Sequence, residues 1–577
     1  MKRYIKHIKP YWIFFVLSPL LMLVEVYCEV KIPSLAAEII NVGVASADVD
    51  QIMYITVQMF AHIILAIIGG VGAAYSANRA AVSFSCDLRA EVFRKIQEFS
   101  FANIDKYSTG SLITRLTNDI TQLQEMVVMC LRMMFRAPGM LCGAIIMSYI
   151  ISPSLSIVFV LLVPLLALVI SITLALSYKK FGALQQKIDG LNTNVQEVLT
   201  NIRVIKAFTR ENHENEKFKK VNSELKTAGL TAYKVTILQM PIMTLIINFG
   251  TISIMWLGSK ALNNSLIEVG DISALITYLT QILMSVNMIA MIFLQGSRAL
   301  VSGKRVLEIL ETEIDIVSDE DATVGKKVES GEIEFRNVDF RYYKNNEEKV
   351  LSNISFVIES GKTVGIIGST GCGKTSLVNL IPRLYDATKG EVLVDGVNVK
   401  EYNLQNLREG VSVVLQNNML FSGTIEENLK WGDKNATANE IEQVAEWSAA
   451  KEFIESKKIG YQAEVEQGGL NLSGGQKQRL CIARALLKKP KILILDDSTS
   501  AVDMTTEASI SYHLNTELKD TTKLIIAQRI SSVIEADRII VMNDGTIESI
   551  GTHDELLATC ITYQEIYHSQ VQKEDLA

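Results

Sequence analysis

The sequence contains no closely spaced pair of cysteines and few charged residues. Its seven cysteines are scattered, with none spaced as C-x-x-C, so neither a zinc site nor a disulfide framework is indicated. Charged residues make up 21% of the 577 residues, hydrophobic residues make up 49%, and the mean hydropathy is +0.23. This composition excludes a disordered or collagen-like chain and is too apolar for an ordinary soluble enzyme. It predicts membrane spans in part of the chain.

An excess of positive charge is also missing. The 56 Lys and Arg are outnumbered by 63 Asp and Glu, which gives a net charge of −7 and no overall basic field to attract nucleic acid. Nucleic acid is therefore not an expected partner.

The first apolar run lacks a convincing signal-peptide cleavage site, and five more such runs follow, so we interpret it as an uncleaved membrane span. The length predicts at least two domains.

Six apolar stretches lie before residue 300, each long enough to cross a hydrocarbon layer of ~30 Å as a helix. They are Tyr11–Pro33, Ile52–Ala77, Met126–Ile151, Leu155–Ser177, Val235–Leu262 and Ile272–Leu294. The segments that would face outside, Ser34–Gln51, Ser152–Ser154 and Asn263–Asp271, contain no Lys or Arg, whereas the other connecting segments contain many. We therefore expect a multi-pass protein of the cell membrane, in contact with the lipid bilayer, with both termini in the cytoplasm.

Two long charged segments without Pro, Arg79–Glu125 and Tyr178–Lys234, have apolar residues at helical spacing. They should extend the membrane helices well into the cytoplasm. The helical pattern runs to about Glu311, and an acidic stretch poor in apolar residues follows it. The sequence thus predicts an all-α membrane domain over residues 1–311, a linker over 312–330 and a second domain over 331–577.

Four ionisable residues fall inside the predicted spans. Glu25 and Glu29 lie one turn apart on the first, and Arg132 and Arg136 lie one turn apart on the third. Because charge in hydrocarbon is costly, these side chains should face a cavity or a partner. Glu25 and Glu29 are the candidates for a substrate cavity, since the topology places them in the outer half of the membrane. The alternative is a structural ion pair, although we expect the arginines nearer the cytoplasmic side.

The second domain contains a phosphate-binding motif. The sequence GIIGSTGCGKTS fits G-x-x-x-x-G-K-T, follows an apolar strand and precedes a helical pattern. Its glycines let backbone N–H groups surround phosphate oxygens, Lys374 reaches the β and γ phosphates, and Thr375 offers a hydroxyl to Mg²⁺. We expect ATP to bind here as the Mg²⁺ complex. The nucleotide-binding residues are Gly368, Ser369, Thr370, Gly371, Cys372, Gly373, Lys374, Thr375 and Ser376.

Two further motifs follow along the chain. The apolar strand in KILILDDSTSAVD ends at Asp496, a carboxylate suited to Mg²⁺. The segment LSGGQKQR, Leu472–Arg479, places a Ser and two Gly before a helix and forms a second anion-binding helix start. Its candidate nucleotide contacts are Ser473, Gly474, Gly475 and Gln476.

Taken in order, the P-loop, SVVLQNN, LSGGQ, ILILDD and SAVD resemble an ATP-binding cassette, and nearly the whole chain resembles a half-transporter of the ABC exporter family. The resemblance implies six membrane helices fused to an α/β P-loop NTPase domain of the ABC type. It also implies that Tyr342 stacks on adenine, that Gln416 senses Mg²⁺ and the membrane domain, and that Asp503 links two sites across a dimer. Asn103–Asp119 and Asn201–Phe218 resemble the family's two cytoplasmic loops with coupling helices.

The catalytic positions depart from the family pattern. The family places a glutamate after the Mg²⁺ aspartate, and this chain has Asp497; the family places a histidine after the next strand, and this chain has Gln528. Aspartate is one methylene shorter, about 1.5 Å of reach. Since a misplacement of about 1 Å can cost ~10²-fold in rate, an impaired hydrolytic site with intact nucleotide binding is expected.

The resemblance also has consequences for assembly. In cassette dimers, ATP lies between the P-loop of one subunit and the signature of the other, so a monomer completes no site. We therefore expect a heterodimer with a second half-transporter whose competent P-loop faces Ser473–Gln476, driving export of a small amphiphile such as a drug, lipid or peptide by alternating access. The alternatives are a nucleotide-gated regulator or channel subunit and an importer on an exporter-type scaffold. Soluble cassette roles in translation or DNA repair are excluded by the membrane spans.

Overall fold

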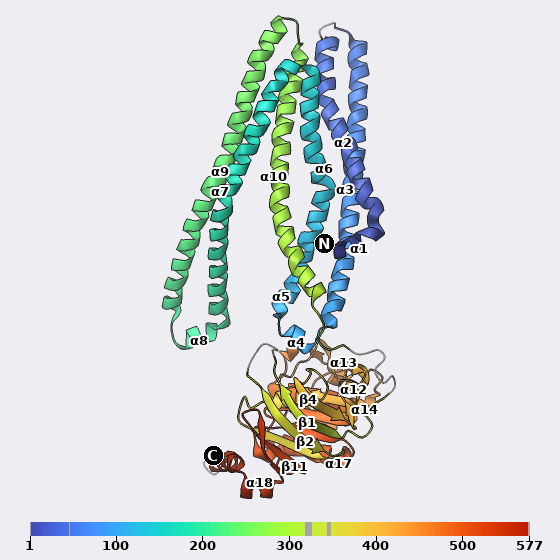
Figure 1. The fold of residues 1–577 in the computed structure, drawn as a ribbon, viewed down its shortest axis with the longest axis vertical. Helices are drawn as coiled ribbons and strands as arrows, with labels where there is room; N and C mark the ends of the chain where they lie inside the picture. Colours follow the sequence, from blue (N-terminus) through green and yellow to red (C-terminus); the bar gives the residue numbers. More distant parts are fainter. Residues whose placement is uncertain (1, 45–46, 318–325, 343–347, 575–577) are drawn as a thin grey trace. The chain divides into compact units, whose positions relative to one another are not determined.

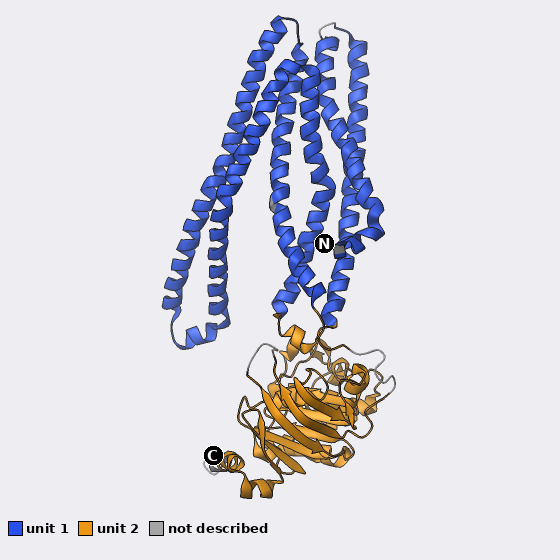
Figure 2. Ribbon diagram, in the orientation of Figure 1, with its two compact units in different colours: residues 1–97, 109–312 blue, residues 98–108, 313–577 orange. Residues whose placement is uncertain are grey.

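The computed structural model describes residues 2–44, 47–317, 326–342 and 348–574. The chain divides into two compact units, which are coloured separately in Figure 2. Unit 1 comprises residues 1–97 and 109–312, and unit 2 comprises residues 98–108 and 313–577. Unit 2 therefore includes a short segment from the amino-terminal half of the chain.

Unit 1 consists of long helices (Figure 1). Among the described residues, six helical segments are long and apolar enough to cross a membrane, and each contains one of the six predicted apolar stretches. The prediction of an all-α membrane domain with six spans is confirmed. The elements are α1 (Lys2–Ile8), η1 (Lys9–Tyr11), α2 (Trp12–Glu38), η2 (Ile39–Val44), α3 (Val49–Gln97), α5 (Thr109–Thr114), η3 (Arg115–Asp119), α6 (Ile120–Ile151), α7 (Pro153–Thr200), α8 (Ile202–Ala207), α9 (Glu211–Asn263) and α10 (Val269–Glu311).

The ends of these helices follow from local sequence. Ser152 caps the start of α7 by accepting a hydrogen bond from the Leu155 N–H at 3.4 Å, and Pro153 occupies the first helical position. Polar residues also stop the long α3, because Ser100 and Asn103 form a capping box that starts the separate helix α4 (Phe101–Ile104). The segment Arg79–Glu125 is therefore helical but interrupted, and α3 continues 20 residues beyond Ala77.

Unit 2 is built on a six-stranded sheet in the order β12-β11-β3-β10-β9-β6, in which β12 pairs antiparallel and the other neighbours pair parallel. A four-stranded antiparallel sheet, β2-β1-β4-β5, and the short pair β7-β8 complete the strands. The strands are β1 (Ile333–Phe340), β2 (Leu351–Ile358), β3 (Thr363–Gly368), β4 (Lys389–Val394), β5 (Val397–Asn398), β6 (Val411–Val414), β7 (Gly423–Thr424), β8 (Glu464–Val465), β9 (Ile492–Asp496), β10 (Thr522–Ile526), β11 (Arg538–Asn543) and β12 (Thr546–Gly551).

Helices separate the strands of unit 2. The predicted α/β architecture is confirmed, and the apolar run of β9 is buried along its whole length, as expected for a central parallel strand. The helices are α11 (Lys374–Asn379), α12 (Leu404–Gly410), α13 (Ile425–Leu429), α14 (Ala438–Trp447), α15 (Lys451–Glu455), η4 (Gly460–Gln462), η5 (Gln467–Gly469), α16 (Gly474–Leu487), α17 (Met504–Glu517), η6 (Ile530–Ser532), α18 (His553–Thr559) and α19 (Ile561–Glu574).

Helix α4 packs within unit 2. The Asp105 carboxylate accepts a hydrogen bond from the Tyr385 hydroxyl at 2.7 Å, and Phe101 lies edge-on to the Tyr385 ring with 6.0 Å between ring centroids. The Asn103 amide donates to the Glu313 carbonyl at 3.1 Å. Residues 103–108, the start of the first segment that resembles a coupling helix, thus contact the rest of unit 2 through hydrogen bonds of Asn103 and Asp105, and Phe101 of α4 adds an aromatic contact.

Candidate nucleotide site

The candidate site lies at the carboxyl edge of the parallel strands, where ligands bind in open α/β sheets. Strand β3 ends at Gly368 and runs into the P-loop, β9 ends at Asp496, and β10 is followed closely by Gln528. The register places Ile526 of β10 opposite both Asp496 and Ile366. Parallel pairing therefore gathers the three motifs at one edge of the sheet.

The P-loop has the backbone that the motif requires. Gly368 has a φ of +155°, and a Cβ there would lie 2.2 Å from the Met542 carbonyl oxygen, so no other residue fits beside β11. Gly371 has a φ of +87°, and a Cβ there would meet no atom within 4 Å. The loop is thus closely packed at its base and open at its tip.

Lys374 and Tyr342 flank this loop. The Lys374 ammonium donates to the carbonyl oxygens of Gly368 and Ser369, each at 2.8 Å, and so lies folded over the P-loop. The Tyr342 hydroxyl hydrogen-bonds the Ser376 hydroxyl at 2.7 Å, and its ring packs edge-on against Tyr385 with 5.1 Å between centroids. Tyr342 is 37% exposed and offers an aromatic surface next to the loop.

Thr375 and Asp496 present donor atoms that fit the Mg²⁺ ion predicted from the sequence. The Thr375 hydroxyl donates to the Asp496 carboxylate, so two hard oxygen atoms lie together beside the P-loop. Burial raises the pKa of Asp496, the Asp497 charge adds to that rise, and the Thr375 hydrogen bond opposes it. No cluster of three or more His, Cys, Asp or Glu that would hold a metal occurs among the described residues. This donor set suits Mg²⁺ that is shared with phosphate oxygens.

Asp497 and Gln528 contact each other directly. The Gln528 Nε2 donates to the Asp497 Oδ2 at 2.8 Å. Asp497 has a φ of +50°, in the left-handed region that few residues other than Gly adopt. Burial raises the pKa of Asp497, and hydrogen bonds from Gln416 and Gln528 oppose that rise. The two positions that depart from the family pattern thus form one hydrogen-bonded pair, and Gln416 joins it.

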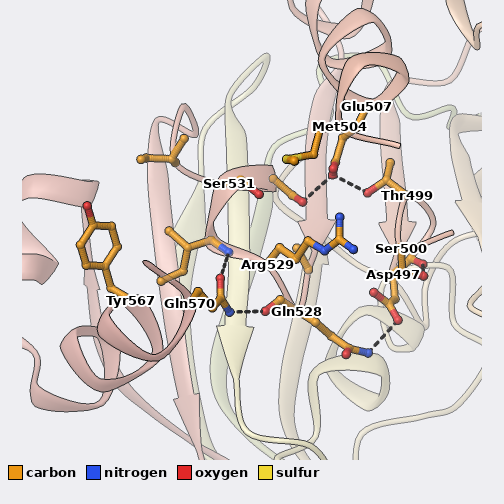
Figure 3. Close-up of a pocket in the computed structure, with 14 residues that line it drawn as sticks. Asp497, Thr499, Ser500, Met504, Glu507, Gln528, Arg529, Ser531, Tyr567 and Gln570 are labelled. Atoms are coloured by element: carbon orange, nitrogen blue, oxygen red, sulfur yellow. Dashed lines mark hydrogen bonds between the residues drawn. The ribbon is translucent and has the colours of Figure 1, made fainter. Parts of the chain in front are cut away.

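A cleft of about 680 Å³ opens beside this pair (Figure 3). Glu507 of α17 lies in its wall and is 8% exposed. Its carboxylate accepts hydrogen bonds from the hydroxyl of Thr499 at 2.8 Å and from the hydroxyl of Ser532. Glu507 therefore ties the segment after β9 to the segment after β10.

The signature segment starts helix α16. Ser473 is the N-cap: its hydroxyl accepts from the Gln476 N–H at 3.3 Å, and the Gln476 side chain accepts from the Ser473 N–H at 3.1 Å. A Cβ at Gly475 would lie 2.8 Å from the Ala501 carbonyl oxygen, so the motif packs closely on the loop after β9. Gln478 holds that loop by accepting from the Ala501 N–H at 3.0 Å.

Asp503 caps helix α17. Its carboxylate accepts from the side chain of Thr505 and from the backbone and hydroxyl of Thr506. These hydrogen bonds lower its pKa below the ordinary range. In the structure Asp503 is therefore a charged cap at the end of the segment that carries Asp497.

The structure brings together one part of the predicted site and leaves another apart. Thr375, Asp496, Asp497, Gln416 and Gln528 form one connected group. Within the described residues, no hydrogen bond joins Ser473 or Gln476 to that group. This separation within one chain fits a site that two chains would complete.

The charged residues of the membrane unit form a triad. Arg136 of α6 donates to Glu25 and also to both oxygens of Glu29, at 2.7 and 3.0 Å. Gly139 and Gly143 of α6 lie beside Val26 and Val30 of α2, so the Arg136 backbone lies nearer the start of α2 than Glu25 and Glu29, and its side chain reaches across to both. Glu25 is 7% exposed. The structure thus contains the ion pair that was the alternative to a cavity role.

Two residues of the site went unnoticed in the sequence. Glu507 lies in the helix after SAVD. Gln570 lies in α19, and its side-chain amide forms hydrogen bonds with the backbone of Gln528 and Ile530. Neither belongs to a recognisable motif. The available signal for Glu507 was its spacing, because it lies three and seven residues before the apolar Ile510 and Leu514 on the same helix face. Gln570 is one of several glutamines near the carboxyl end.

Comparisons with known proteins give matches to ABC transporter families in both halves of the chain. Residues 15–286 match the family described as ABC transporter transmembrane region, and residues 351–500 match the family described as ABC transporter. The ABC transporter ATP-binding protein YfiB of Bacillus subtilis is 38% identical over 574 residues, which cover 100% of this chain and 99% of YfiB. An ABC transporter ATP-binding protein of Mycobacterium tuberculosis is 36% identical over 568 residues, covering 98% and 97% of the two chains.

A solved structure has the same fold. The structure of a bacterial Atm1-family ABC exporter with ATP bound matches with a TM-score of 0.80 at 23% identity, covering 97% of this chain and 98% of that one. At this identity the likeness concerns the fold of the two units.

Proposed function

Because the chain belongs to the ABC transporter family, we propose that it is one subunit of an ATP-driven exporter that moves a small amphiphile across the membrane by alternating access. The observation that carries this proposal is the connected group of Thr375, Asp496, Asp497 and Gln528 beside the P-loop, in a chain with six membrane helices. Membership of this family implies ATP-coupled transport. The exporter fold of the solved relative supports the direction.

The residues of the site have separate roles in this proposal. Lys374 turns from the P-loop carbonyls to the β and γ phosphates, and backbone N–H groups around Gly371 hold phosphate oxygens. Thr375 and Asp496 hold Mg²⁺, which neutralises phosphate charge when bound. Tyr342 stacks on the adenine through its exposed ring. Gln416 reports the state of the site to the membrane helices.

Hydrolysis at this P-loop is slow in our proposal. Asp497 is short, and one of its oxygens already accepts from Gln528, so it activates water poorly. Gln528 donates a hydrogen bond but has no proton to exchange near neutral pH. The intact Ser473–Gln476 segment then serves the competent P-loop of a second half-transporter. The complex is a heterodimer. In this chain, residues 1–311 form the transmembrane domain, residues 312–330 the linker and residues 331–577 the nucleotide-binding domain, and both termini lie in the cytoplasm.

The test compares the purified full-length chain with a restored variant in lipid nanodiscs. The wild type should bind Mg²⁺-ATP and turn it over slowly, and Asp497→Glu with Gln528→His should raise turnover by about 10-fold or more. Lys374→Ala in the same protein should weaken binding and serves as the control for specific nucleotide contact. If the wild type and the restored variant hydrolyse ATP at equal rates, the impaired-site proposal fails.

Transport needs a separate measurement. The chain and its partner in vesicles should accumulate a labelled cationic amphiphile only with ATP, through complexes whose cassettes face the medium. ATP-dependent release of preloaded amphiphile through those same complexes would instead indicate import. Binding without any movement would indicate a regulatory subunit.

A further inference from the structure

Helix α19 is anchored to unit 2 by residues other than Gln570. Tyr563 is fully buried, and its hydroxyl hydrogen-bonds the His553 Nδ1 at 2.7 Å. Ile566 and Tyr567 pack on a core that includes Ala527 and Ile530. The Gln564 amide donates to the Leu557 carbonyl of α18 at 2.7 Å. The helix therefore has its own hydrophobic and polar attachments, and the contacts of Gln570 are additional.

Gln570 makes two hydrogen bonds to the loop after β10. Its Nε2 donates to the Gln528 carbonyl at 2.8 Å, and its Oε1 accepts from the Ile530 N–H at 2.9 Å (Figure 3). A side-chain amide that donates to one residue and accepts from the next but one imitates a peptide group of a neighbouring strand. These two bonds, which we name the Gln570 clasp, fix the backbone on both sides of Arg529.

One hydrogen bond, from the Gln528 side chain to Asp497, connects the clasp to the candidate site. The backbone that it fixes belongs to Gln528, whose side chain donates to Asp497. On the far side of the loop, Ser532 donates to Glu507, which also accepts from Thr499. The segment from Gln528 to Ser532 is thus held by α19 at its start and by α17 at its end.

We propose that Gln570 is a positioning residue, which holds the main chain of Gln528 and Ile530 so that the side chain at position 528 faces the carboxylate at position 497. The reach of the side chain at position 528 depends on this backbone. Strand β10 ends at Ile526, and the Ala527 N–H, which donates to the Ile366 carbonyl at 3.3 Å, makes the last backbone hydrogen bond to β3 before residue 528 among the described residues. Helix α19 thereby becomes part of the hydrolytic site. This inference rests on the proposed ATPase function only for its kinetic test.

The first experiment measures the clasp directly by hydrogen–deuterium exchange of the full-length protein. Gln570→Met keeps the length of the side chain and removes both hydrogen bonds, so the backbone amide of Ile530 should exchange roughly 10-fold faster. Gln564→Met makes the same chemical change on the same helix and should leave the segment 527–533 unchanged. Gln570→Glu retains the acceptor for the Ile530 N–H and should protect that amide better than Gln570→Met.

The second experiment asks whether the clasp positions residue 528. In the background Asp497→Glu with Gln528→His, Gln570→Met should lower kcat for ATP by roughly 10-fold and leave KM unchanged, since nucleotide binding uses the P-loop. Gln564→Met should lower neither. A general loss of structure would instead change KM and kcat together and would speed exchange around Tyr563.

The outcomes separate the two proposals. Unchanged exchange at Ile530 in Gln570→Met overturns the clasp, whatever the ATPase rate. Faster exchange with an unchanged kcat overturns its positioning role. If the restored background hydrolyses no faster than the wild type, the impaired-site proposal fails, and the same comparison is made in the wild-type chain, where the clasp predicts the same loss of kcat.

Discussion

At the scale of single residues, Asp497 and Gln528, the two positions at which the sequence predicts a departure from the family pattern, form one hydrogen-bonded pair. The Gln528 amide donates to the Asp497 carboxylate, and this hydrogen bond partly offsets the cost of burying its charge. The hydrogen bond occupies the Oδ2 atom of Asp497. Asp497 has a left-handed backbone conformation. Such a strained conformation persists only where contacts with neighbouring residues hold it in place. Hydrogen bonds from Gln416 and Gln528 to Asp497 hold the segment after β9.

The charge of Asp497 should cost stability at neutral pH. Burial raises its pKa in the folded protein above the unfolded value of about 3.9, so the stability contributed by this group is complete below that value and is lost as pH rises through the folded pKa. Asp497→Asn should therefore raise the thermal unfolding temperature without nucleotide by roughly 1–3 °C at pH 7.5, a small effect because the group is partly exposed. Near pH 4 the gain should shrink.

Asp503→Asn is the matched control for this measurement. Its pKa is lowered by hydrogen bonds from Thr505 and Thr506, so the ionised form stabilises the fold above the unfolded pKa, and its loss should lower the unfolding temperature at pH 7.5. Intrinsic fluorescence during heating reports both variants. A destabilising Asp497→Asn at neutral pH would contradict the predicted sign.

How much of the site could be read from the sequence depends on how local its chemistry is. The P-loop, Asp496 and the start of α16 are short motifs whose neighbours along the chain supply the geometry, and the structure places them at helix starts and strand ends as expected. Gln570 lies 42 residues from Gln528, and only the packing of α19 makes them neighbours. Sequence periodicity carries no information on such a contact.

At the scale of elements, the membrane triad shows what hydropathy reads and what it misses. The six helices follow from composition, and so does the cost of placing Glu25 and Glu29 among them. Their partner follows only from the packing of α2 against α6. Helix α3 joins this contact through Gly70, where a Cβ would lie 2.9 Å from the unpaired Oε2 of Glu25. Two carboxyl groups thus share one arginine as their hydrogen-bond donor.

Removing the cation of the triad should destabilise the membrane unit. Arg136→Ala leaves the buried carboxylate of Glu25 and the half-buried carboxylate of Glu29 without this partner. Such a change costs roughly 3–5 kcal/mol for buried pairs and should lower the unfolding temperature by roughly 5–10 °C. Arg132→Ala, one turn earlier on α6, is the control, because the Nε of Arg132 has no acceptor among the described residues. Thermal aggregation in detergent measures both variants. Equal losses would show that Arg136 has no special role.

The carboxylates of the triad test the substrate proposal. If Glu25 and Glu29 line the translocation cavity, their double substitution to Gln should leave expression and basal ATPase normal and reduce export of a cationic amphiphile several-fold. The ion pair seen in the structure predicts poor assembly with any substrate instead. Export rates of a cationic and a neutral amphiphile, measured beside protein yield, distinguish these results. Unchanged export of the cationic amphiphile by a well-assembled protein would end the cavity proposal.

At the scale of the whole molecule, each chain has one P-loop and one signature segment, and these elements would serve different sites in a dimer. A mutation in one chain then acts on the site to which its residue contributes. In the proposed heterodimer, the P-loop group of this chain includes Asp497 and Gln528, the positions proposed to slow hydrolysis, whereas Ser473 and Gln476 start the signature helix proposed to serve the partner's P-loop. A heterodimer therefore predicts unequal effects from changes within a single polypeptide.

The decisive prediction concerns this inequality. With the partner half-transporter present, Ser473→Ala in this chain should lower ATPase activity by roughly 10-fold, because it removes a donor to the competent site, whereas Asp497→Ala should lower it by less than about 2-fold. Ser473 also caps α16 through a capping box, and losing a cap costs ~1 kcal/mol. Thr437→Ala removes a similar capping box from α14 in the same unit and controls for that loss. If Ser473→Ala and Thr437→Ala have equal effects, the signature segment of this chain serves no active site. If Asp497→Ala reduces the rate as strongly as Ser473→Ala, both sites hydrolyse ATP and the asymmetric assignment is wrong.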